Sequence, residues 1–344
     1  MRNPRAVTIY AQNVNIGGAK ILLQTLVQRL VSAYPELKVR VLLADSKDLD
    51  VDDPRVVKEI LRGAWQKARV MWRREENVLY FGNLPPLRRA KDSLLYVHNL
   101  YMTLTPGTLL ADPLVSAGQK LKYGFLNTYL RCFSRRAESV ACQTPAMKSR
   151  LEVFLREPVE VLPFYRSPIE QDLPRKFDFC YVGIPSAHKN HERFFEALSI
   201  LSQEGIKVRV AVTISDAPAD RGLLAAVDRL NREGIVTVSN WGLVSFEEAC
   251  SIYNQSQSLF FPSLKESFGM PVVEALELGL QLLIADLPYA DALVRGGVRF
   301  DPYSVESMTD AMKQFLHQPD EVPRAELLTQ DASQRIIQRL MGEG

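Results

Sequence analysis

The stretch "SLFFPSLKESFGMPVVEALELGLQLLIAD", residues 258–286, decides the fold. Two apolar runs, 258–263 and 281–286, flank a segment of helical length that begins near Pro271. Continuous apolar runs are typical of strands that are buried on both faces, and a helix between two such strands is the repeating unit of a parallel sheet. The stretch therefore predicts a strand, a helix and a second strand of an α/β sheet.

The same alternation extends along the whole chain and predicts two doubly wound α/β domains, each with a parallel sheet between helices. In the first half we predict strands at 6–12, 38–45, 77–83, 94–99, 139–144 and 159–164, with helices between them, notably at 18–33 and 118–133. In the second half we predict strands at 177–183, 207–214, 234–242, 258–263 and 281–286, and helices near 190–203, 218–233, 245–256 and 271–280.

The length of 344 residues fits two domains, and two domains imply a cleft between them. A polar stretch that contains proline interrupts the alternation after residue 163 and is the best candidate for a linker. We predict an N-terminal domain at 1–165, a linker at 166–176, a C-terminal domain at 177–318 and a closing helix within 319–344. The apolar positions of that helix are Leu327, Leu328, Ile336, Ile337, Leu340 and Met341.

Composition is average for a globular protein, and no apolar run approaches the roughly 20 residues that span a bilayer. The chain enters a strand without the apolar core of a signal peptide, so we predict a cytoplasmic protein. Four widely spaced cysteines, Cys132, Cys142, Cys180 and Cys250, form no Cys-x-x-Cys pair. This spacing favours free thiols over a zinc site or a disulfide framework.

Charge divides unevenly between the two halves. Residues 1–163 hold 25 Lys and Arg against 15 Asp and Glu, a balance of +10, and the remainder has a balance of −8. Such an asymmetry is found in proteins that meet nucleic acid or an anionic membrane, and also on ordinary solvated faces. The basic half lacks a basic motif interleaved with aromatic residues, which disfavours nucleic acid.

Ligands of open α/β sheets bind beyond the carboxyl ends of the strands, so the segments after the strands are where a site is expected. After the first strand, "QNVNIGGAK" (12–20) places Gly17 and Gly18 at a helix start, where backbone N–H groups face a ligand. A tight turn with no ligand explains the same residues. The chain has neither Gly-x-Gly-x-x-Gly nor a P-loop motif, so a nicotinamide or P-loop nucleotide site is disfavoured.

The segment "YVGIPSAHKNHERFFEAL" (181–198) follows the first strand of the second domain. Asn190 is predicted to be a helix N-cap, which puts Lys189 beside a helix N-terminus that attracts anions such as phosphate. An exposed lysine in a loop is the alternative. His188 and His191 have no third ligand at a suitable spacing, so a metal site is disfavoured.

Two carboxylates, Glu266 and Glu274, flank the turn in "PSLKESFGMPVVEAL" (262–276). Glu266 is predicted in the loop and Glu274 in the first turn of the helix that Pro271 begins. The backbone N–H groups of Phe268, Gly269 and Met270 lie between them and are available to ligand oxygens. Alternatively, Glu274 only complements the helix dipole, a contribution of about 0.3–1 kcal/mol.

The stretch "FFPSLKESFGMPVVEALELGLQLLIADLPY" resembles the donor segment of glycosyltransferase family 4, the retaining enzymes of GT-B fold, whose motif is Glu-x7-Glu flanked by Phe-Gly. "NIGGAK" is similar to the glycine loop of that family. "YVG...HKNHERFFEAL" is similar to its lysine segment, and "WGLVSFEEACSIYNQSQSLFFPS" to the stretch before the motif. The resemblance is tight over 177–302. Over the first domain it is looser, and there "NVLYFGNLPPL" and "LLYVHN" are similar to enzymes of bacterial surface-polysaccharide assembly.

The resemblance implies a role for each motif residue. Glu274 would hold the ribose hydroxyls of the nucleotide, Glu266 the hydroxyls of the donor sugar, and Lys189 the diphosphate. The Gly17–Gly18 loop would contact the donor phosphates or the acceptor. In addition, the final helix would cross back onto the first domain, although packing on the second domain is nearly as well supported.

The resemblance also bears on two further positions, His98 and Ile184. His98 would occupy the place of a histidine near the transferred sugar, although a histidine at a strand end is often structural. Ile184 stands where the family commonly has an arginine that binds the diphosphate, and Lys265 or Arg166 would have to substitute for that arginine.

The activity that the resemblance implies is hexose transfer with retention, from a nucleoside-diphosphate sugar such as GDP-mannose. The acceptor would be a saccharide or a polyprenyl-diphosphate-linked saccharide in O-antigen or capsule synthesis, at the inner face of the cytoplasmic membrane. The stretch 177–302, where the resemblance is tight, contains no Asp-x-Asp, so we expect neither a metal nor a cofactor, and the sugar nucleotide is a substrate. A sugar-nucleotide 2-epimerase of the same fold and a non-catalytic sugar-nucleotide-binding protein are the alternatives.

Overall fold

The computed structural model describes residues 6–14, 17–73, 75–155 and 157–343. The chain divides into two compact units. The N-terminal unit comprises Met1–Arg166 and Gln330–Gly344, and the C-terminal unit comprises Ser167–Thr329. The stretch 167–176 is attached to the C-terminal unit, because the backbone N–H of Gln171 donates to Asn254 Oδ1 at 3.1 Å.

The described residues of the N-terminal unit form a parallel seven-stranded sheet in the order β3-β2-β1-β4-β5-β6-β7. The chain runs outward from β1 in one direction and then restarts at β4 on its other side, so the topological switch lies between β1 and β4. The strands are β1 (Ala6–Tyr10), β2 (Lys38–Leu43), β3 (Val56–Ile60), β4 (Val78–Tyr80), β5 (Ser93–Val97), β6 (Ser139–Cys142) and β7 (Glu160–Val161).

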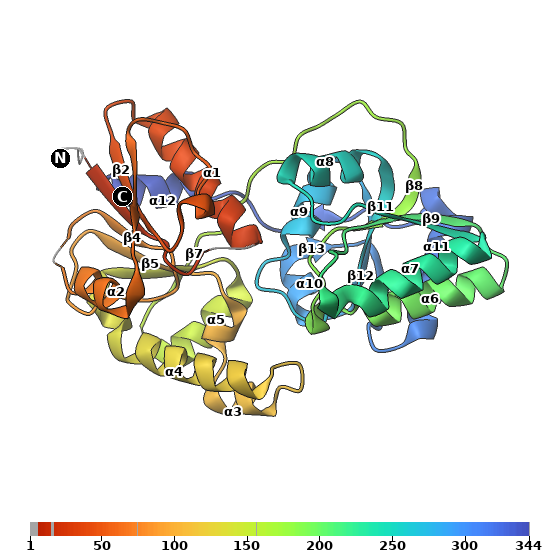
Figure 1. Ribbon diagram of the computed structural model, residues 1–344, viewed down its shortest axis with the longest axis horizontal. Coiled ribbons are helices and arrows are strands. Elements are labelled where there is room, and N and C mark those ends of the chain that lie inside the picture. Colours follow the sequence, from red (N-terminus) through yellow and green to blue (C-terminus); the bar gives the residue numbers. More distant parts are fainter. Residues whose placement is uncertain (1–5, 15–16, 74, 156, 344) are drawn as a thin grey trace. The chain divides into compact units, whose positions relative to one another are not determined.

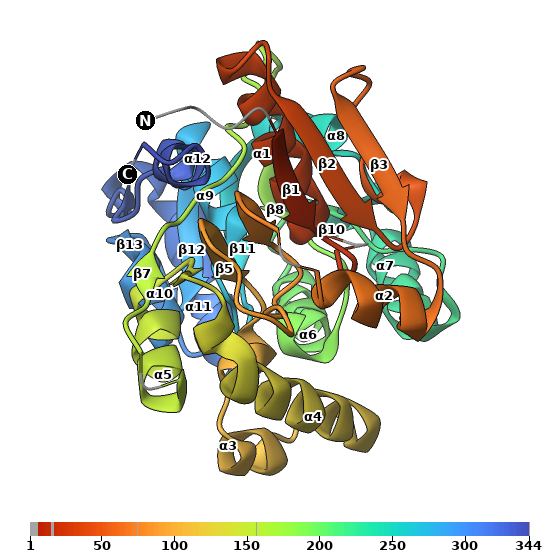
Figure 2. The ribbon, with the colours of Figure 1, turned by 90° about the vertical axis from the view of Figure 1, so that its left-hand side faces the viewer.

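Helices cover both faces of this sheet (Figures 1 and 2). On one face lie α1 (Gly18–Ala33) and the C-terminal α12 (Ser333–Leu340). On the other lie α2 (Gly63–Met71), α4 (Ala117–Phe133) and α5 (Pro145–Leu155), with the short α3 (Pro106–Ala111) beside α4. Ser116 and Gln119 form a capping box that fixes the start of α4.

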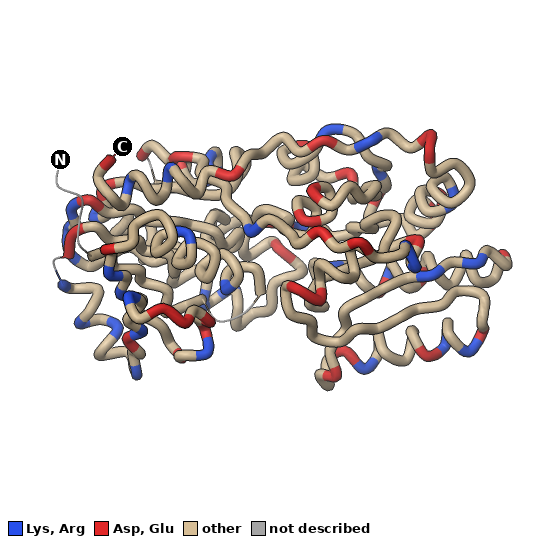
Figure 3. Tube along the Cα trace, turned by 90° about the horizontal axis from the view of Figure 1, so that it is seen from above, with Lys and Arg blue, Asp and Glu red and all other residues tan. Residues whose placement is uncertain are grey.

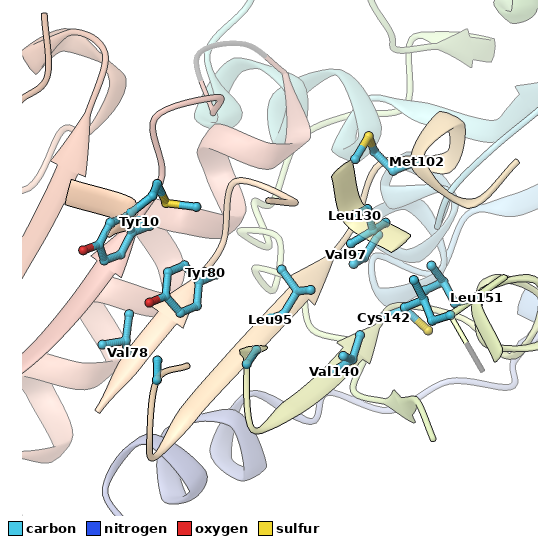
Figure 4. Packing of buried hydrophobic residues seen from close by; sticks show 14 of the residues in the cluster. Tyr10, Val78, Tyr80, Leu95, Val97, Met102, Leu130, Val140, Cys142 and Leu151 are labelled. Carbon is cyan, nitrogen blue, oxygen red and sulfur yellow. The ribbon is translucent and has the colours of Figure 1, made fainter. Parts of the chain in front are cut away.

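The core between the sheet and α2, α4 and α5 is apolar and closely packed (Figure 4). The central strands β1, β4 and β5 carry no charged residue, whereas charges are marked along the outer helices and loops (Figure 3). Buried side chains of the sheet and the helices meet in this cluster, among them Tyr10, Val78, Tyr80, Leu95, Val97, Leu130, Val140, Cys142 and Leu151.

The described residues of the C-terminal unit form a parallel six-stranded sheet in the order β10-β9-β8-β11-β12-β14, so its topological switch lies between β8 and β11. The strands are β8 (Phe177–Tyr181), β9 (Val208–Val212), β10 (Val236–Asn240), β11 (Ser256–Phe261), β12 (Gln281–Ala285) and β14 (Val298–Phe300). The helices are α6 (His191–Gln203), α7 (Arg221–Glu233), α8 (Phe246–Asn254), α9 (Met270–Glu277), α10 (Pro288–Leu293) and α11 (Val305–His317).

The prediction of one helix through Leu327 and Leu328 is wrong. These residues lie in or beside β15 (Glu326–Leu327), which pairs antiparallel with β13 (Val294–Arg295), and the helix begins only at Ser333. The cause is a close approach of two backbones at Gly296, where a Cβ would lie 2.3 Å from the Arg324 carbonyl oxygen. Any residue with a side chain would clash at position 296. Only glycine therefore allows the extended segment to lie this close.

The segment that carries α12 belongs to the N-terminal unit and is bonded to it. Arg29 on α1 forms an ion pair with Asp331 and donates to Ser333 Oγ and to the Tyr165 carbonyl oxygen, the last at 3.1 Å. On α12, Ile336 and Leu340 are buried, and the helix packs against β5. Because Arg29 contacts both chain segments, it joins the end of the chain to the end of the seven-stranded sheet.

We predict that Ile336→Ala lowers the unfolding free energy of the N-terminal unit by about 2–4 kcal/mol, because it removes a buried aliphatic side chain and leaves a cavity. Native-state hydrogen exchange of the β5 amides measures the change. Gln338→Ala, an exposed position on the same helix, is the matched control. Equal protection of β5 in both variants would contradict the packing of α12 on this sheet.

Candidate active site

The candidate site of the C-terminal unit lies at the carboxyl edge of its sheet, where β8 and β11 adjoin at the topological switch. Lys189 follows β8 and Glu266 follows β11, so the switch brings together residues that are 77 positions apart. A crevice forms at this point of doubly wound sheets because the connections leave in opposite directions. The fold therefore gathers the two motif segments at the edge where ligands bind.

Lys189 and Glu266 form an ion pair in which Nζ lies 2.6 Å from Oε1. Their side chains are only 14% and 11% exposed, so both charges are largely withdrawn from water. The ammonium group also lies 5.3 Å from the centroid of the Phe261 ring. A charge in such surroundings needs a partner, and Lys189 is therefore able to hold an anion that replaces or joins Glu266.

The loop that carries Lys189 is fixed by hydrogen bonds. The Tyr181 hydroxyl donates to the Lys189 carbonyl oxygen at 2.6 Å, and the Leu264 N–H donates to the His188 carbonyl oxygen at 2.7 Å. The second bond joins the loop after β8 directly to the loop after β11. The position of the ammonium group is thus set by the backbone of both loops.

Asn190 does not act as the predicted side-chain N-cap. Its backbone is left-handed, with φ of 60°, and its side-chain amide donates to the carbonyl oxygens of Pro262 and Pro302 at 3.3 and 2.8 Å. The side chain bridges two neighbouring loops and caps no backbone N–H of α6; its Oδ1 instead accepts from the Arg193 guanidinium at 3.0 Å. Asparagine tolerates this backbone conformation, which turns the chain sharply into the helix.

Glu274 is buried on α9, and the Tyr253 hydroxyl of α8 donates to its Oε2 at 3.0 Å. Burial, followed by the negative charge of Glu274, raises the pKa of Tyr253 well above its usual value, so the tyrosine stays a donor. The predicted place of Glu274 in the first helical turn is wrong. The helix begins at Met270, before Pro271, so Glu274 is its fifth residue.

The turn into α9 depends on Gly269, whose φ of 87° is left-handed. An added Cβ would lie 3.0 Å from Leu293 Cδ2, so both conformation and space favour glycine. Phe268 is buried beside it, and Lys265 is partly buried in the preceding loop. The amides of Gly269 and Met270 donate to no described group, which leaves two N–H donors at the start of α9.

The two histidines beside Lys189 form no metal site. His191 is buried, stacks on Tyr181 with ring centroids 4.4 Å apart, and has no hydrogen-bond partner at either ring nitrogen. Burial, and then the charge of Lys189, lowers its pKa to about 3. His188 bonds through Nδ1 to Ser186 Oγ at 3.1 Å. Within the described ranges, no three His, Cys, Asp or Glu side chains are grouped as metal ligands.

Ile184, where a cation was expected, is half exposed just beyond β8. Neither of the two predicted substitutes replaces it within the same loop. Lys265 belongs to the loop after β11, and Arg166 ends the first segment of the N-terminal unit. Lys189 is therefore the cation that the β8 loop itself brings to the switch point.

His98 lies at the carboxyl edge of the N-terminal sheet, directly after β5. Its Nε2 lies 2.8 Å from the Phe81 carbonyl oxygen, and its backbone N–H donates to Asn83 Oδ1 at 2.7 Å. Burial lowers the pKa of His98 to about 4, so the ring is neutral at pH 7. With the proton on Nε2 for the Phe81 carbonyl, Nδ1 is left as an acceptor.

Gly17 and Gly18 stand at the start of α1, after β1. Gly17 has a left-handed φ of 63°, and its carbonyl oxygen accepts the N–H of Lys20 at 3.1 Å. Nothing lies within 4 Å of a Cβ added to Gly17, so its conformation, and not crowding, favours glycine. Residues 15 and 16 of the predicted glycine loop lie outside the described residues.

Comparison with known proteins assigns the C-terminal unit. Residues 168–335 match the family described as Glycosyl transferases group 1. This match spans almost all of the C-terminal unit, which is therefore similar to group 1 glycosyltransferases. The match covers Lys189, Glu266 and Glu274 of the candidate site.

A curated relative of the chain is the O-antigen chain mannosyltransferase of Salmonella typhimurium, which is 24% identical over 212 residues. The alignment covers 60% of this chain and 58% of that relative, so the chain spans little more than half of its length. The described part of the chain contains no helix that is long and apolar enough to cross a membrane.

Solved glycosyltransferase structures confirm the predicted GT-B fold. A sucrose-phosphate synthase from Thermosynechococcus elongatus superposes with a TM-score of 0.70 at 14% identity, over 98% of this chain and 94% of that one. HepE of Anabaena, solved in complex with UDP-glucose, superposes with a TM-score of 0.60 at 13% identity, over 98% and 95% of the two chains.

Sequence reasoning missed three supporting residues, Tyr253, Tyr181 and Asn83. Each contacts a site residue from another element: Tyr253 holds Glu274, Tyr181 holds the Lys189 backbone, and Asn83 holds the backbone of His98. The tyrosines resemble ordinary core aromatics in the sequence. The one available signal was Asn83 itself, a polar residue at the end of a predicted strand.

We predict that His98 and His191 do not titrate above about pH 5, because burial holds their pKa values near 4 and 3. Their folded pKa lies below the unfolded value, so the stability they contribute is present above about pH 6.5 and is lost as pH falls. NMR titration of the histidine rings measures the pKa values, and His191→Phe should reduce the loss of stability in acid. A midpoint near pH 6.5 for either ring would contradict the observed burial.

Proposed function

We propose that the protein is a retaining glycosyltransferase that moves a hexose from a nucleoside-diphosphate sugar to a saccharide or lipid-linked saccharide in surface-polysaccharide synthesis. The observation that carries the proposal is the largely buried Lys189–Glu266 pair at the β8–β11 switch point, within the residues that match group 1 glycosyltransferases. A cation and an anion that are held together there match the two ends of a sugar diphosphate.

Glu274 serves as the anchor of the nucleotide in this proposal. A carboxylate accepts hydrogen bonds from two neighbouring hydroxyl groups, which is the arrangement of a ribose. The hydrogen bond from Tyr253 orients one oxygen, and the buried surroundings strengthen the bonds that the carboxylate makes. Glu266, in the loop, accepts from the hydroxyls of the donor sugar.

Lys189 supports the chemical step by electrostatic stabilisation. When the bond between the anomeric carbon and the diphosphate breaks, its electron pair stays on the diphosphate, and the ammonium group and the Gly269 and Met270 amides offset the added charge. The acceptor hydroxyl attacks the anomeric carbon on the face that the leaving group vacates, which retains the configuration. Its proton passes to an oxygen of the diphosphate, so the scheme uses no protein nucleophile, metal or cofactor.

The remaining predicted contacts belong to the same proposal. Lys265 and Phe268 would complete the wall of the donor site around Gly269. Gly17 and Gly18, at the start of α1, would contact the donor phosphates or the acceptor. His98 would accept a hydroxyl of the transferred sugar through Nδ1, because its pKa of about 4 keeps that nitrogen unprotonated.

The donor we propose is GDP-mannose or a closely related hexose nucleotide. Mannose is supported by the name of the Salmonella relative, and a nucleotide-sugar donor by the complex of HepE with UDP-glucose. We place the reaction in the cytoplasm at the inner face of the cytoplasmic membrane, where a polyprenyl-linked acceptor would be available. A non-catalytic sugar-nucleotide-binding protein is the second candidate, because Ile184 removes an expected diphosphate cation.

We predict that Glu274→Ala lowers the affinity for the donor about tenfold or more, because the ribose loses two hydrogen bonds to a charged group. A thermal-shift screen against GDP-, UDP- and dTDP-sugars identifies the donor, since a ligand of the folded state raises the melting temperature. Titration calorimetry then compares the variants. Glu277→Ala, an exposed carboxylate on the same helix, is the matched control, and Glu274→Gln separates loss of charge from loss of shape.

Unchanged donor affinity in both Glu274→Ala and Lys189→Ala would contradict the site. Binding without turnover over a panel of saccharide acceptors would favour the non-catalytic candidate. An epimerised sugar nucleotide in the NMR spectrum of the product would instead favour the 2-epimerase.

A further inference from the structure

The N-terminal unit exposes large apolar side chains on α2, α3 and α4. Trp65 is 85% exposed, Leu121 80% and Phe125 71%, and both Leu110 and Trp72 are more than half exposed. A scattered exposed leucine needs no explanation, but two tryptophans and a phenylalanine on helices that cover the same face of one sheet are unusual for a surface that faces only water.

These side chains belong to one side of the N-terminal unit. The inner sides of α2 and α4 pack in a single cluster against the same face of the sheet, through Val70 and Met71 on α2 and Leu130 on α4. The two helices and α3 therefore present their outer sides away from that face, as both views show (Figures 1 and 2). On α4, Leu121 and Phe125 are one turn apart, so they lie on the same stripe of the helix.

Helices α2 and α4 carry cations and no carboxylates. The segments 61–74 and 113–137 contain no Asp or Glu. The cations lie among the exposed apolar residues: the Arg88 guanidinium is 5.9 Å from the centroid of the Trp72 ring, and Lys67, Arg69 and Lys122 form no ion pair with any described residue. We call the outer sides of α2, α3 and α4 the basic apolar face.

We propose that the basic apolar face docks the protein on the surface of an anionic lipid bilayer, with Trp65, Trp72, Leu121 and Phe125 entering the headgroup region. Tryptophan places an amphipathic ring at such an interface, and each nearby Lys or Arg adds attraction to anionic lipid. A highly charged nucleic acid would use the cations but would leave Leu121 and Phe125 in water. A second copy would bring two cationic faces together, which repel.

Docking by this face deepens the proposed function, because it would hold the N-terminal unit where a lipid-linked acceptor lies. It does not depend on the chemistry of the C-terminal unit. Binding to vesicles is measured without a sugar nucleotide, so its failure and the failure of the donor site are separate results.

Sedimentation of the full chain with lipid vesicles tests the proposal. We expect binding at low salt to phosphatidylcholine vesicles that contain about a third phosphatidylglycerol, and little binding to phosphatidylcholine alone. Trp65→Ser with Phe125→Ser should weaken binding at least about tenfold, because apolar surface no longer enters the bilayer. Arg69→Ser with Lys122→Ser should weaken it by a similar factor at low salt and less at high salt.

Matched controls lie on the C-terminal unit. Leu243→Ser removes an exposed leucine, and Lys207→Ser with Arg221→Ser removes the same total charge from another surface. Neither should change vesicle binding, and circular dichroism verifies that every variant is folded. In a Trp241→Phe background, emission from Trp65 and Trp72 should shift to shorter wavelength when vesicles are added.

Three results would overturn the proposal. Equal binding to neutral and anionic vesicles would show that the cations of the face do not attract the protein to anionic lipid. An unshifted tryptophan emission, or normal binding by the Trp65–Phe125 variant, would show attraction without insertion. A concentration-dependent dimer that Phe125→Ser dissociates would assign the face to a second copy of the chain.

Discussion

The candidate site depends on one ion pair, Lys189 with Glu266, held at the point where the parallel sheet of the C-terminal unit changes direction. Each charge is largely withdrawn from water and is stabilised by the other, so the pair keeps a cation and an anion together at the switch point. The surrounding hydrogen bonds from Tyr181, Leu264 and Asn190 fix the backbone of the two loops that carry it. A ligand with a diphosphate and a hydroxylated sugar would satisfy both charges at once.

Glu274 extends the same arrangement into the next helix. The left-handed turn at Gly269 starts α9, and the helix then carries the carboxylate to the hydroxyl of Tyr253. The edge of the N-terminal sheet also carries polar groups, but these are uncharged. His98 is neutral, and Asn83 bonds the backbone beside it. The charged groups of the candidate site thus lie in the C-terminal unit, whereas the edge of the N-terminal sheet offers neutral hydrogen-bonding groups suited to sugar hydroxyls.

The sequence predicted the elements whose patterns are strong and local. The helix predicted at 18–33 is observed at Gly18–Ala33, because its apolar spacing and its starting glycines depend on nearby residues only. Strand β3 was not predicted, since "VVKEI" places charges within a short edge strand. The extended β15 was mistaken for helix because its contact with Gly296, about 30 residues away, has no local signal. The Lys189–Glu266 contact likewise needed the three-dimensional order of β8 and β11, and the resemblance alone assigned the two residues to separate ends of the ligand.

The most direct test of the central claim compares two ligands on one variant, Glu266→Gln, by titration calorimetry. If Lys189 faces the diphosphate and Glu266 the sugar, Glu266→Gln should weaken binding of the sugar nucleotide about tenfold, because the sugar loses a hydrogen bond to a charged acceptor. The same variant should bind the nucleoside diphosphate as well as the wild type or better, because a competing negative charge is removed. An equal loss of affinity for both ligands, or no change for either, would contradict this division of roles.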